Sequence, residues 1–130
     1  MIDEEVRVLG GQSEQVFVGG FSQGGTAAMA TFLLYSGGRL GGCAVHSGAN
    51  LAIIDYEKEV DLELKRQSEI CMYHGEADPT VTLELSKRTF AIFDEHQLNY
   101  TLTTEPDLKH NLSKKGVTHL SKFLTEAMTT

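Results

Sequence analysis

The glycine-rich stretch VFVGGFSQGG, residues 16–25, contains one serine, Ser22, directly after a short apolar run. A serine hydroxyl is a poor nucleophile at neutral pH. It attacks a carbonyl carbon only when a base lies within hydrogen-bond reach and a third group orients that base. Residues 20–24 fit the pattern G-x-S-x-G, which presents a nucleophilic serine on a sharp turn between a strand and a helix. The stretch therefore indicates acyl-transfer chemistry, provided that the fold places a base and an acid beside the serine.

The two glycines of this pattern have a steric interpretation. A turn this sharp forces Ser22 into a strained backbone conformation. We expect that any side chain at Gly20 or Gly24 would collide with the neighbouring strand or helix. The alternative is a glycine-rich turn that a serine merely caps, and the five-residue pattern alone does not exclude it. An apolar run before the serine and a helical pattern after it favour the nucleophile.

Candidates for the other two groups follow Ser22 in the order that this kind of site requires, first an acid and then a histidine. Asp78 lies in HGEADPTV, after an apolar run that ends near residue 75, and His110 lies in EPDLKHNLS, after the next run. We therefore predict that Asp78 orients His110 and that His110 is the base. Each residue has a simpler interpretation, because Asp-Pro is a common turn and loop histidines are commonly surface residues. Asp107 competes as the acid, but it lies only three residues before His110, in the same loop.

Four further histidines compete with His110 for the role of the base. His46 and His74 lie at the ends of expected strands, where we expect them to support loops or to pack at the rim. His96 and His119 fall inside expected helices, and we expect them to be exposed or structural.

The elements that must position these residues alternate along the chain. Strands are expected at 15–19, 41–48, 69–75 and 99–105, and helices at 25–38, 81–97 and 114–130, while 51–68 joins an apolar LAII to an acidic, helix-prone stretch without a clear assignment. Such alternation predicts an α/β fold with about four mainly parallel strands and helices on both faces of the sheet. Ligand sites of such sheets lie beyond the carboxyl ends of the strands, which is where the three candidate residues fall. In the helix at 81–97, the expected core positions are Leu83, Leu85, Phe90, Ile92 and Phe93.

Composition narrows the range of functions. The 130 residues suit one domain, 1–130, and the net charge of −7 argues against nucleic-acid binding, which needs clustered Lys and Arg. We expect no metal, because no His/Cys spacing suits one, and no integral membrane segment, because no apolar run is long enough. Cys43 and Cys71 lie in apolar stretches, so we expect them to be reduced and buried. Together with a start that lacks a secretory pattern, this predicts a cytoplasmic protein.

Three stretches of the chain resemble one known family. GFSQGG around Ser22, HGEADPTV around Asp78 and KHNLS around His110 resemble the acyl-protein thioesterase and carboxylesterase branch of the α/β-hydrolases. The resemblance implies a serine hydrolase without a cofactor, in which Ser22 is the nucleophile, His110 the general base and acid, and Asp78 the orienting carboxylate. It implies as substrates small acyl esters, lysophospholipids or S-acylated proteins. The backbone N–H of Gln23 would be one donor of the oxyanion hole.

The resemblance covers only the C-terminal portion of that family, so we expect a truncated domain that lacks the N-terminal strands. In the family, a glycine-rich loop supplies the second oxyanion donor. We therefore expect this chain alone to be at most a weak esterase. The strand at 15–19 would form an exposed edge, which invites self-association. The alternative hypothesis is a catalytically impaired remnant that acts as an interaction module or has no function.

Overall fold

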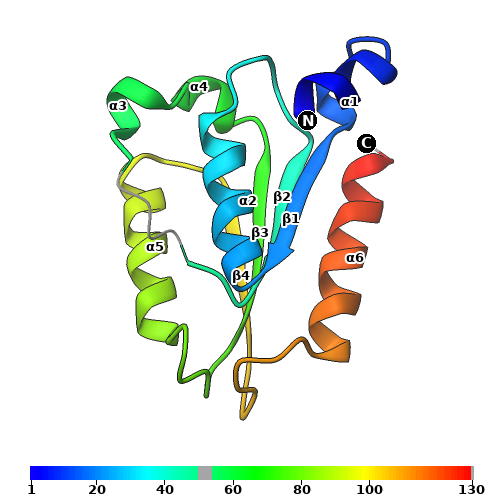
Figure 1. Ribbon diagram of the computed structural model, residues 1–130. Coiled ribbons are helices and arrows are strands. Elements are labelled where there is room, and N and C mark those ends of the chain that lie inside the picture. The colour runs from blue at the N-terminus through cyan, green and yellow to red at the C-terminus, as the bar shows by residue number, and fades with distance from the viewer. Residues whose placement is uncertain (50–53, 130) are drawn as a thin grey trace.

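The computed structural model describes residues 1–49 and 54–129, which form a four-stranded parallel sheet with helices around it (Figure 1). The strands are β1 (Phe17–Phe21), β2 (Gly42–His46), β3 (Glu69–Gly75) and β4 (Tyr100–Glu105), and they lie side by side in chain order. Every neighbouring pair is parallel, so the carboxyl ends of all four strands lie at the same end of the sheet.

Helices cover both faces of this sheet. The described helices are α1 (Ile2–Val8), α2 (Gln23–Leu34), α3 (Tyr56–Glu59), α4 (Leu62–Lys65), α5 (Leu83–Glu95) and α6 (Lys114–Met128), with a 3₁₀ turn at Ser13–Gln15. Figure 1 shows α2 and α5 on one side of the sheet and α6 on the other. The predicted α/β class, with parallel strands between layers of helices, is confirmed.

The core lies between the sheet and the layer that contains α2 and α5. Every residue of β2 is buried, as are all residues of β3 except the first, which is half-buried. Central strands of a parallel sheet are covered on both faces, so their sequences are nearly continuous apolar runs. From α2, Met29, Phe32 and Leu33 contribute fully buried side chains.

The start of the first strand was predicted two residues too early. β1 runs from Phe17 to Phe21, and α2 begins at Gln23, so the strand meets the helix at Ser22. Gly19 and Gly20 lie inside the strand, although the prediction treated the glycines as its end. A Cβ at Gly19 would lie 2.7 Å from the carbonyl oxygen of Ala44, so glycine permits β1 and β2 to approach closely.

The predicted core face of α5 was only partly correct. Phe90 and Phe93 are buried, and Ile92 packs against the core. By contrast, Leu83 and Leu85 are only half-buried, and the small polar residues Ser86 and Thr89 are buried in their place. The hydroxyl of Ser86 can be buried because it forms hydrogen bonds with groups at the carboxyl-terminal end of the sheet.

The unassigned stretch contains two short helices. Asp55 caps α3 by accepting a hydrogen bond from the Lys58 N–H at 3.3 Å, and Asp61 caps α4 by accepting one from the Leu64 N–H at 3.2 Å. Residues 51–53 of the apolar LAII lie outside the described part of the chain.

A buried lysine connects α4 to the end of α2. Lys65 is 2% exposed, and its Nζ donates a hydrogen bond to the carbonyl oxygen of Tyr35 at 2.7 Å. The ammonium also lies 5.0 Å from the centre of the Phe32 ring, within cation–π range. Burial lowers the pKa of Lys65 to about 8, and the nearby Asp61 carboxylate opposes this shift.

Candidate active site

Ser22 stands at the junction of β1 and α2 in a left-handed backbone conformation. Its φ is 57° and its ψ is −120°, which is an unfavourable region for a residue with a side chain. The backbone is held on both sides. The Ser22 N–H donates to the carbonyl of His46 at 3.0 Å, and the Ser22 carbonyl accepts from the Thr26 N–H at 3.0 Å. The strained turn expected from the sequence is therefore present.

The steric role predicted for the two glycines of the pattern holds for one of them. A Cβ at Gly20 would collide with the backbone of Gly24. A Cβ at Gly24 would meet nothing within 4 Å, so that part of the prediction was wrong. Gly24 lies on the exposed side of the first turn of α2, whereas Gly25 faces the sheet, and a Cβ there would lie 2.8 Å from Cγ1 of Val45.

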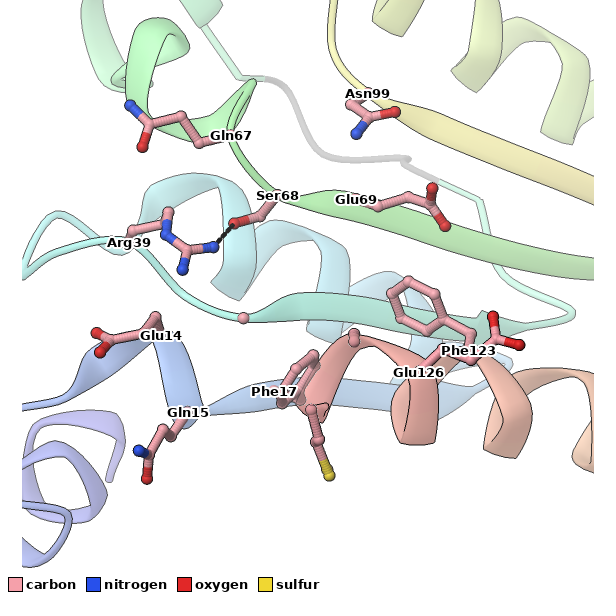
Figure 2. A pocket seen from close by; sticks show the side chains of 13 residues that line it. Glu14, Gln15, Phe17, Arg39, Gln67, Ser68, Glu69, Asn99, Phe123 and Glu126 are labelled. Atoms are coloured by element: carbon pink, nitrogen blue, oxygen red, sulfur yellow. Dashed lines mark hydrogen bonds between the residues drawn. The ribbon is translucent and has the colours of Figure 1, made fainter. Parts of the chain in front are cut away.

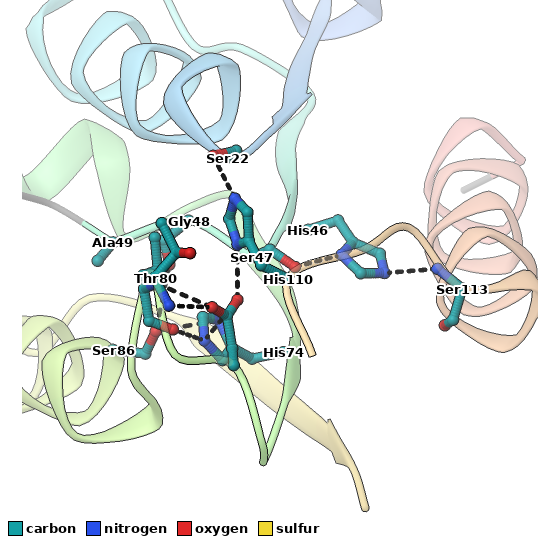
Figure 3. Close-up of polar contacts among 12 residues, drawn as sticks. Ser22, His46, Ser47, Gly48, Ala49, His74, Thr80, Ser86, His110 and Ser113 are labelled. Atoms are coloured by element: carbon teal, nitrogen blue, oxygen red, sulfur yellow. Dashed lines mark hydrogen bonds and ion pairs between the residues drawn. The ribbon is translucent and has the colours of Figure 1, made fainter. Parts of the chain in front are cut away.

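Ser22, His110 and Asp78 form one hydrogen-bonded chain. Ser22 Oγ lies 2.8 Å from His110 Nε2, and His110 Nδ1 lies 2.7 Å from Asp78 Oδ2. Figure 3 shows Ser22 pointing toward the His110 ring. An ionised carboxylate can only accept, so Nδ1 carries the proton of a neutral ring and Nε2 is the acceptor for the serine O–H. The structure thus brings together the three residues selected from the sequence, although they come from three separate loops.

The carboxylate of Asp78 is buried and almost fully hydrogen-bonded. Its Oδ1 accepts from the backbone N–H of Thr80 at 2.8 Å and of Val81 at 2.9 Å, and its Oδ2 accepts from His110. Burial alone would raise the pKa of Asp78, but hydrogen bonds from His110, Val81 and Thr80 outweigh it and lower this pKa below its ordinary value. The carboxylate is therefore ionised at neutral pH, as an orienting acid must be.

The loop that carries His110 is fixed at its far end by a polar cluster. Ser113 caps α6, where its Oγ accepts from the Gly116 N–H at 2.8 Å and donates to Glu105 at 2.7 Å. The hydroxyl of Tyr73 donates to the same Glu105 oxygen at 2.6 Å, which ties the loop to β3. These contacts anchor the end of the loop that follows His110.

His46 and His74 support loops at the carboxyl-terminal end of the sheet, as expected, and both are 1% exposed. His46 Nε2 accepts from the Ser113 N–H at 3.4 Å, so its Nδ1 donates to Ser47 Oγ at 2.8 Å. Burial, with help from nearby His74, lowers the pKa of His46, which favours this neutral form. His74 contacts the Asp78 loop and Ser86 (Figure 3).

The remaining competitors lie apart from the serine. Asp107 is exposed in the turn after β4, with a φ of 63°. His96 stacks on Tyr56 with ring centres 4.7 Å apart, and His119 contacts the hydroxyl of Thr103 at 3.1 Å. Both therefore have structural contacts, as expected, although only His119 lies in a helix, because α5 ends at Glu95.

Gln23, the predicted oxyanion donor, is the first residue of α2. The backbone N–H groups in the first turn of a helix have no acceptor within the helix, and they give its N-terminus a partial positive charge. The Gln23 N–H directly follows Ser22 in the chain, and its role as an oxyanion donor stays a prediction.

A cavity of about 910 Å³ lies at the amino-terminal end of the sheet. Figure 2 shows side chains that line it. Phe17, Glu69 and Asn99, at or next to the amino-terminal ends of their strands, contribute to its lining together with Phe123 from α6. Ser22, by contrast, lies beyond the carboxyl end of β1. Among the described residues, no group of three or more His, Cys, Asp or Glu side chains could hold a metal ion. Within the same residues, no helix has the length and apolarity needed to cross a bilayer.

Comparison with known proteins places this arrangement in a family. The family model described as phospholipase/carboxylesterase matches residues 1–128. The chain is 29% identical to acyl-protein thioesterase 1 of Neurospora crassa over 116 residues, which cover 89% of the chain and 47% of that protein. It is also 29% identical to carboxylesterase SOBER1 of Arabidopsis thaliana over 128 residues, which cover 95% of the chain and 53% of that protein.

The fold agrees with these sequence matches. The crystal structure of Arabidopsis thaliana SOBER1 superposes with a TM-score of 0.88 at 29% identity, covering 98% of this chain and 59% of the other. The chain thus spans about half the length of the curated relatives it matches, and its sheet is part of an α/β-hydrolase fold. Because the family model matches almost every residue and the shared fold extends over the whole chain, the chain belongs to the phospholipase/carboxylesterase family.

Proposed function

We propose that the chain carries the catalytic groups of a serine hydrolase that cleaves carboxylic esters or thioesters. Ser22 is the nucleophile, His110 the general base and acid, and Asp78 the group that orients His110. The observation that carries the proposal is the hydrogen-bonded chain from Ser22 Oγ through the imidazole, with contacts of 2.8 and 2.7 Å. These are the distances that proton transfer from a serine hydroxyl requires.

The proposed reaction has two halves. Ser22 Oγ bonds to the acyl carbonyl carbon while its proton moves to His110 Nε2, and the tetrahedral intermediate then expels the alcohol or thiol, which takes that proton. Water next attacks the acyl-enzyme as His110 removes a proton from it. The ester bond to Ser22 breaks, the serine recovers the proton, and a carboxylic acid leaves.

The oxyanion of each intermediate receives a hydrogen bond from the backbone N–H of Gln23. One such donor contributes about 2.7–4 kcal/mol, or about 10²- to 10³-fold in rate. The resemblance assigns the second donor to a glycine-rich loop outside this sequence, so the proposed activity of the chain alone is weak.

The proposed substrates are a small acyl ester, a lysophospholipid or an S-acylated protein. The names of the relatives, acyl-protein thioesterase and carboxylesterase, support this range. Every proton transfer is assigned to a side chain of this chain, so the mechanism includes no cofactor. Cys43 and Cys71 are free and buried, which supports a reducing compartment such as the cytoplasm.

The hydrolysis of p-nitrophenyl butyrate by the full chain tests the proposal. We expect slow turnover, an early burst of nitrophenol from acylation, and loss of both in Ser22→Ala. Ser121→Ala, at an exposed position of α6, is the matched control and should keep both. Turnover that survives Ser22→Ala, or no turnover by the unmodified chain, would overturn the proposal and favour the catalytically impaired remnant.

A further inference from the structure

We infer that His74 is a positioning residue, which holds the loop of Asp78 so that one carboxylate oxygen faces His110. The inference rests on the proposed function and adds to it a fourth side chain that does not touch the reacting atoms. It concerns one contact in particular, the hydrogen bond between the His74 ring and the backbone of Val81.

The geometry around His74 determines which ring nitrogen carries the proton. His74 Nε2 lies 2.6 Å from the carbonyl oxygen of Val81. A carbonyl can only accept a hydrogen bond, so Nε2 must be protonated and must donate. The ring is 1% exposed, and water therefore does not replace this contact.

Val81 is in turn bound to Asp78. Its N–H donates to Asp78 Oδ1 at 2.9 Å, while its C=O accepts from His74, so this peptide segment is held from both sides. Thr80 adds a second N–H to Oδ1 at 2.8 Å. With Oδ1 occupied by the backbone, Oδ2 is left to accept from His110 at 2.7 Å. The rotation of the carboxylate thus depends on the position of the backbone that His74 holds.

The other ring nitrogen of His74 faces a different element. Nδ1 lies 3.1 Å from Ser86 Oγ of α5, and Ser86 Oγ lies 3.3 Å from the carbonyl oxygen of Gly48, just after β2 (Figure 3). His74 Nε2 also lies 3.7 Å from Asp78 Oδ2. The imidazole therefore spans the space between the Asp78 loop and α5.

Two amide side chains can separate the contacts of the two ring nitrogens. The amide of Gln extends about as far as Nε2, so His74→Gln can still donate to Val81. The shorter amide of Asn extends only about as far as Nδ1, so His74→Asn can keep the Ser86 contact but loses the one to Val81. If the Val81 contact positions Asp78, Gln should rescue the function of His74 and Asn should not.

Two measurements on the full chain test this inference. The first is the ¹⁵N NMR spectrum of the histidine rings, which reports the tautomer of His110. We expect the Nδ1-protonated form in the unmodified chain and in His74→Gln, and a mixture of tautomers in His74→Asn. The second is the rate at which a fluorophosphonate labels Ser22. It should fall at least about tenfold in His74→Asn, as expected for a lost buried hydrogen bond, and much less in His74→Gln.

His96→Gln is the control for replacing a histidine elsewhere, because that ring stacks on Tyr56, away from the serine. It should leave both readouts unchanged. The inference is overturned if His74→Asn keeps the tautomer and labelling rate of the unmodified chain, or if His74→Gln loses them equally. An unmodified chain that is not labelled at all would refute the proposed function instead, and the NMR comparison would still decide the role of His74.

Discussion

The glycines beside Ser22 differ in their steric roles, although both belong to the same sequence pattern. A Cβ at Gly20 would collide with the backbone of Gly24, whereas one at Gly24 would meet nothing within 4 Å. We predict that Gly20→Ala lowers the free energy of unfolding by about 1–3 kcal/mol, as overpacking does. Gly24→Ala should be neutral or stabilise by about 0.5–1 kcal/mol, because alanine favours the helix. Urea denaturation of both variants would measure this, and equal effects would contradict it.

The proposed role of Asp78 gives a second prediction at this scale. In Asp78→Asn the amide can donate to His110 Nδ1, which favours the tautomer that cannot accept the serine proton. Labelling of Ser22 should slow by roughly 10⁴-fold, the cost of the wrong tautomer in a serine–histidine–aspartate site. An unchanged labelling rate would remove Asp78 from the mechanism.

The same variant has a predicted effect on acid stability. The pKa of Asp78 is lowered in the folded chain, so its ionised form stabilises the fold above the unfolded value of about 4. That contribution is lost as the pH falls from about 4 through the lower, folded pKa. Asp78→Asn should therefore lose less stability than the unmodified chain between about pH 5 and about pH 2, as measured from urea midpoints. A steeper acid loss in the variant would contradict this.

The sequence was sufficient to select Ser22, Asp78 and His110, because each follows a recognisable apolar run and their order matches the chemistry. Whether they act in catalysis stays a prediction. The contact of His74 with Val81 was not predictable, because its acceptor is a backbone carbonyl. Every type of residue at position 81 would offer the same carbonyl, whatever its side chain. The difference between Gly24 and Gly25 was missed because it depends on which side of α2 faces the sheet.

At the scale of elements, the buried ammonium of Lys65 makes the α2–α4 contact sensitive to pH. Its pKa of about 8 is lower than the unfolded value of about 10.4, so between these values the unfolded chain binds more protons. This shift alone makes the free energy of unfolding rise from pH 7.5 to pH 9.5. Burial raises the pKa of the Cys43 and Cys71 thiols, which acts in the opposite direction, so a comparison of urea midpoints between variants isolates the Lys65 contribution.

A matched pair of variants isolates this effect. Lys65→Met removes the titrating group, so from pH 7.5 to pH 9.5 its free energy of unfolding should gain less, or fall more, than that of the unmodified chain. Lys58→Met, at an exposed position of α3, should follow the unmodified chain. The upper limit of pH 9.5 lies below the unfolded tyrosine pKa of about 10, which keeps the tyrosine contribution small. An equal change in Lys65→Met and Lys58→Met would refute the assignment.

The positions of most elements followed from apolar periodicity, and β3 matches its predicted range of 69–75. The errors have physical causes. Glycines usually end a strand, but in β1 Gly19 packs closely against Ala44 and Gly20 against Gly24 of α2, so both lie within the strand. The stretch after residue 54 forms two short helices, which are capped by Asp55 and Asp61. The burial of these helices depends on tertiary contacts that a local sequence pattern does not contain.

For the whole molecule, β1 forms one of the two free edges of the described sheet. β1 pairs only with β2, and β4 forms the other edge. We propose that β1 pairs with a second copy of the chain, since unpaired backbone groups of an edge strand attract another strand. The sedimentation coefficient should rise with concentration, and amide exchange at Phe17 and Phe21 should slow. Exchange at Thr125 in α6 is the internal control, and sedimentation independent of concentration would contradict the proposal.

The central claim is that His110 activates Ser22 and no other serine. Its most direct test is to treat the full chain with a fluorophosphonate and to locate the adduct by mass spectrometry of peptides, beside the variant His110→Gln. We predict one adduct, on Ser22, and a large loss of its rate of formation in His110→Gln. An adduct on a different residue, or an equal rate in the variant, would contradict the account.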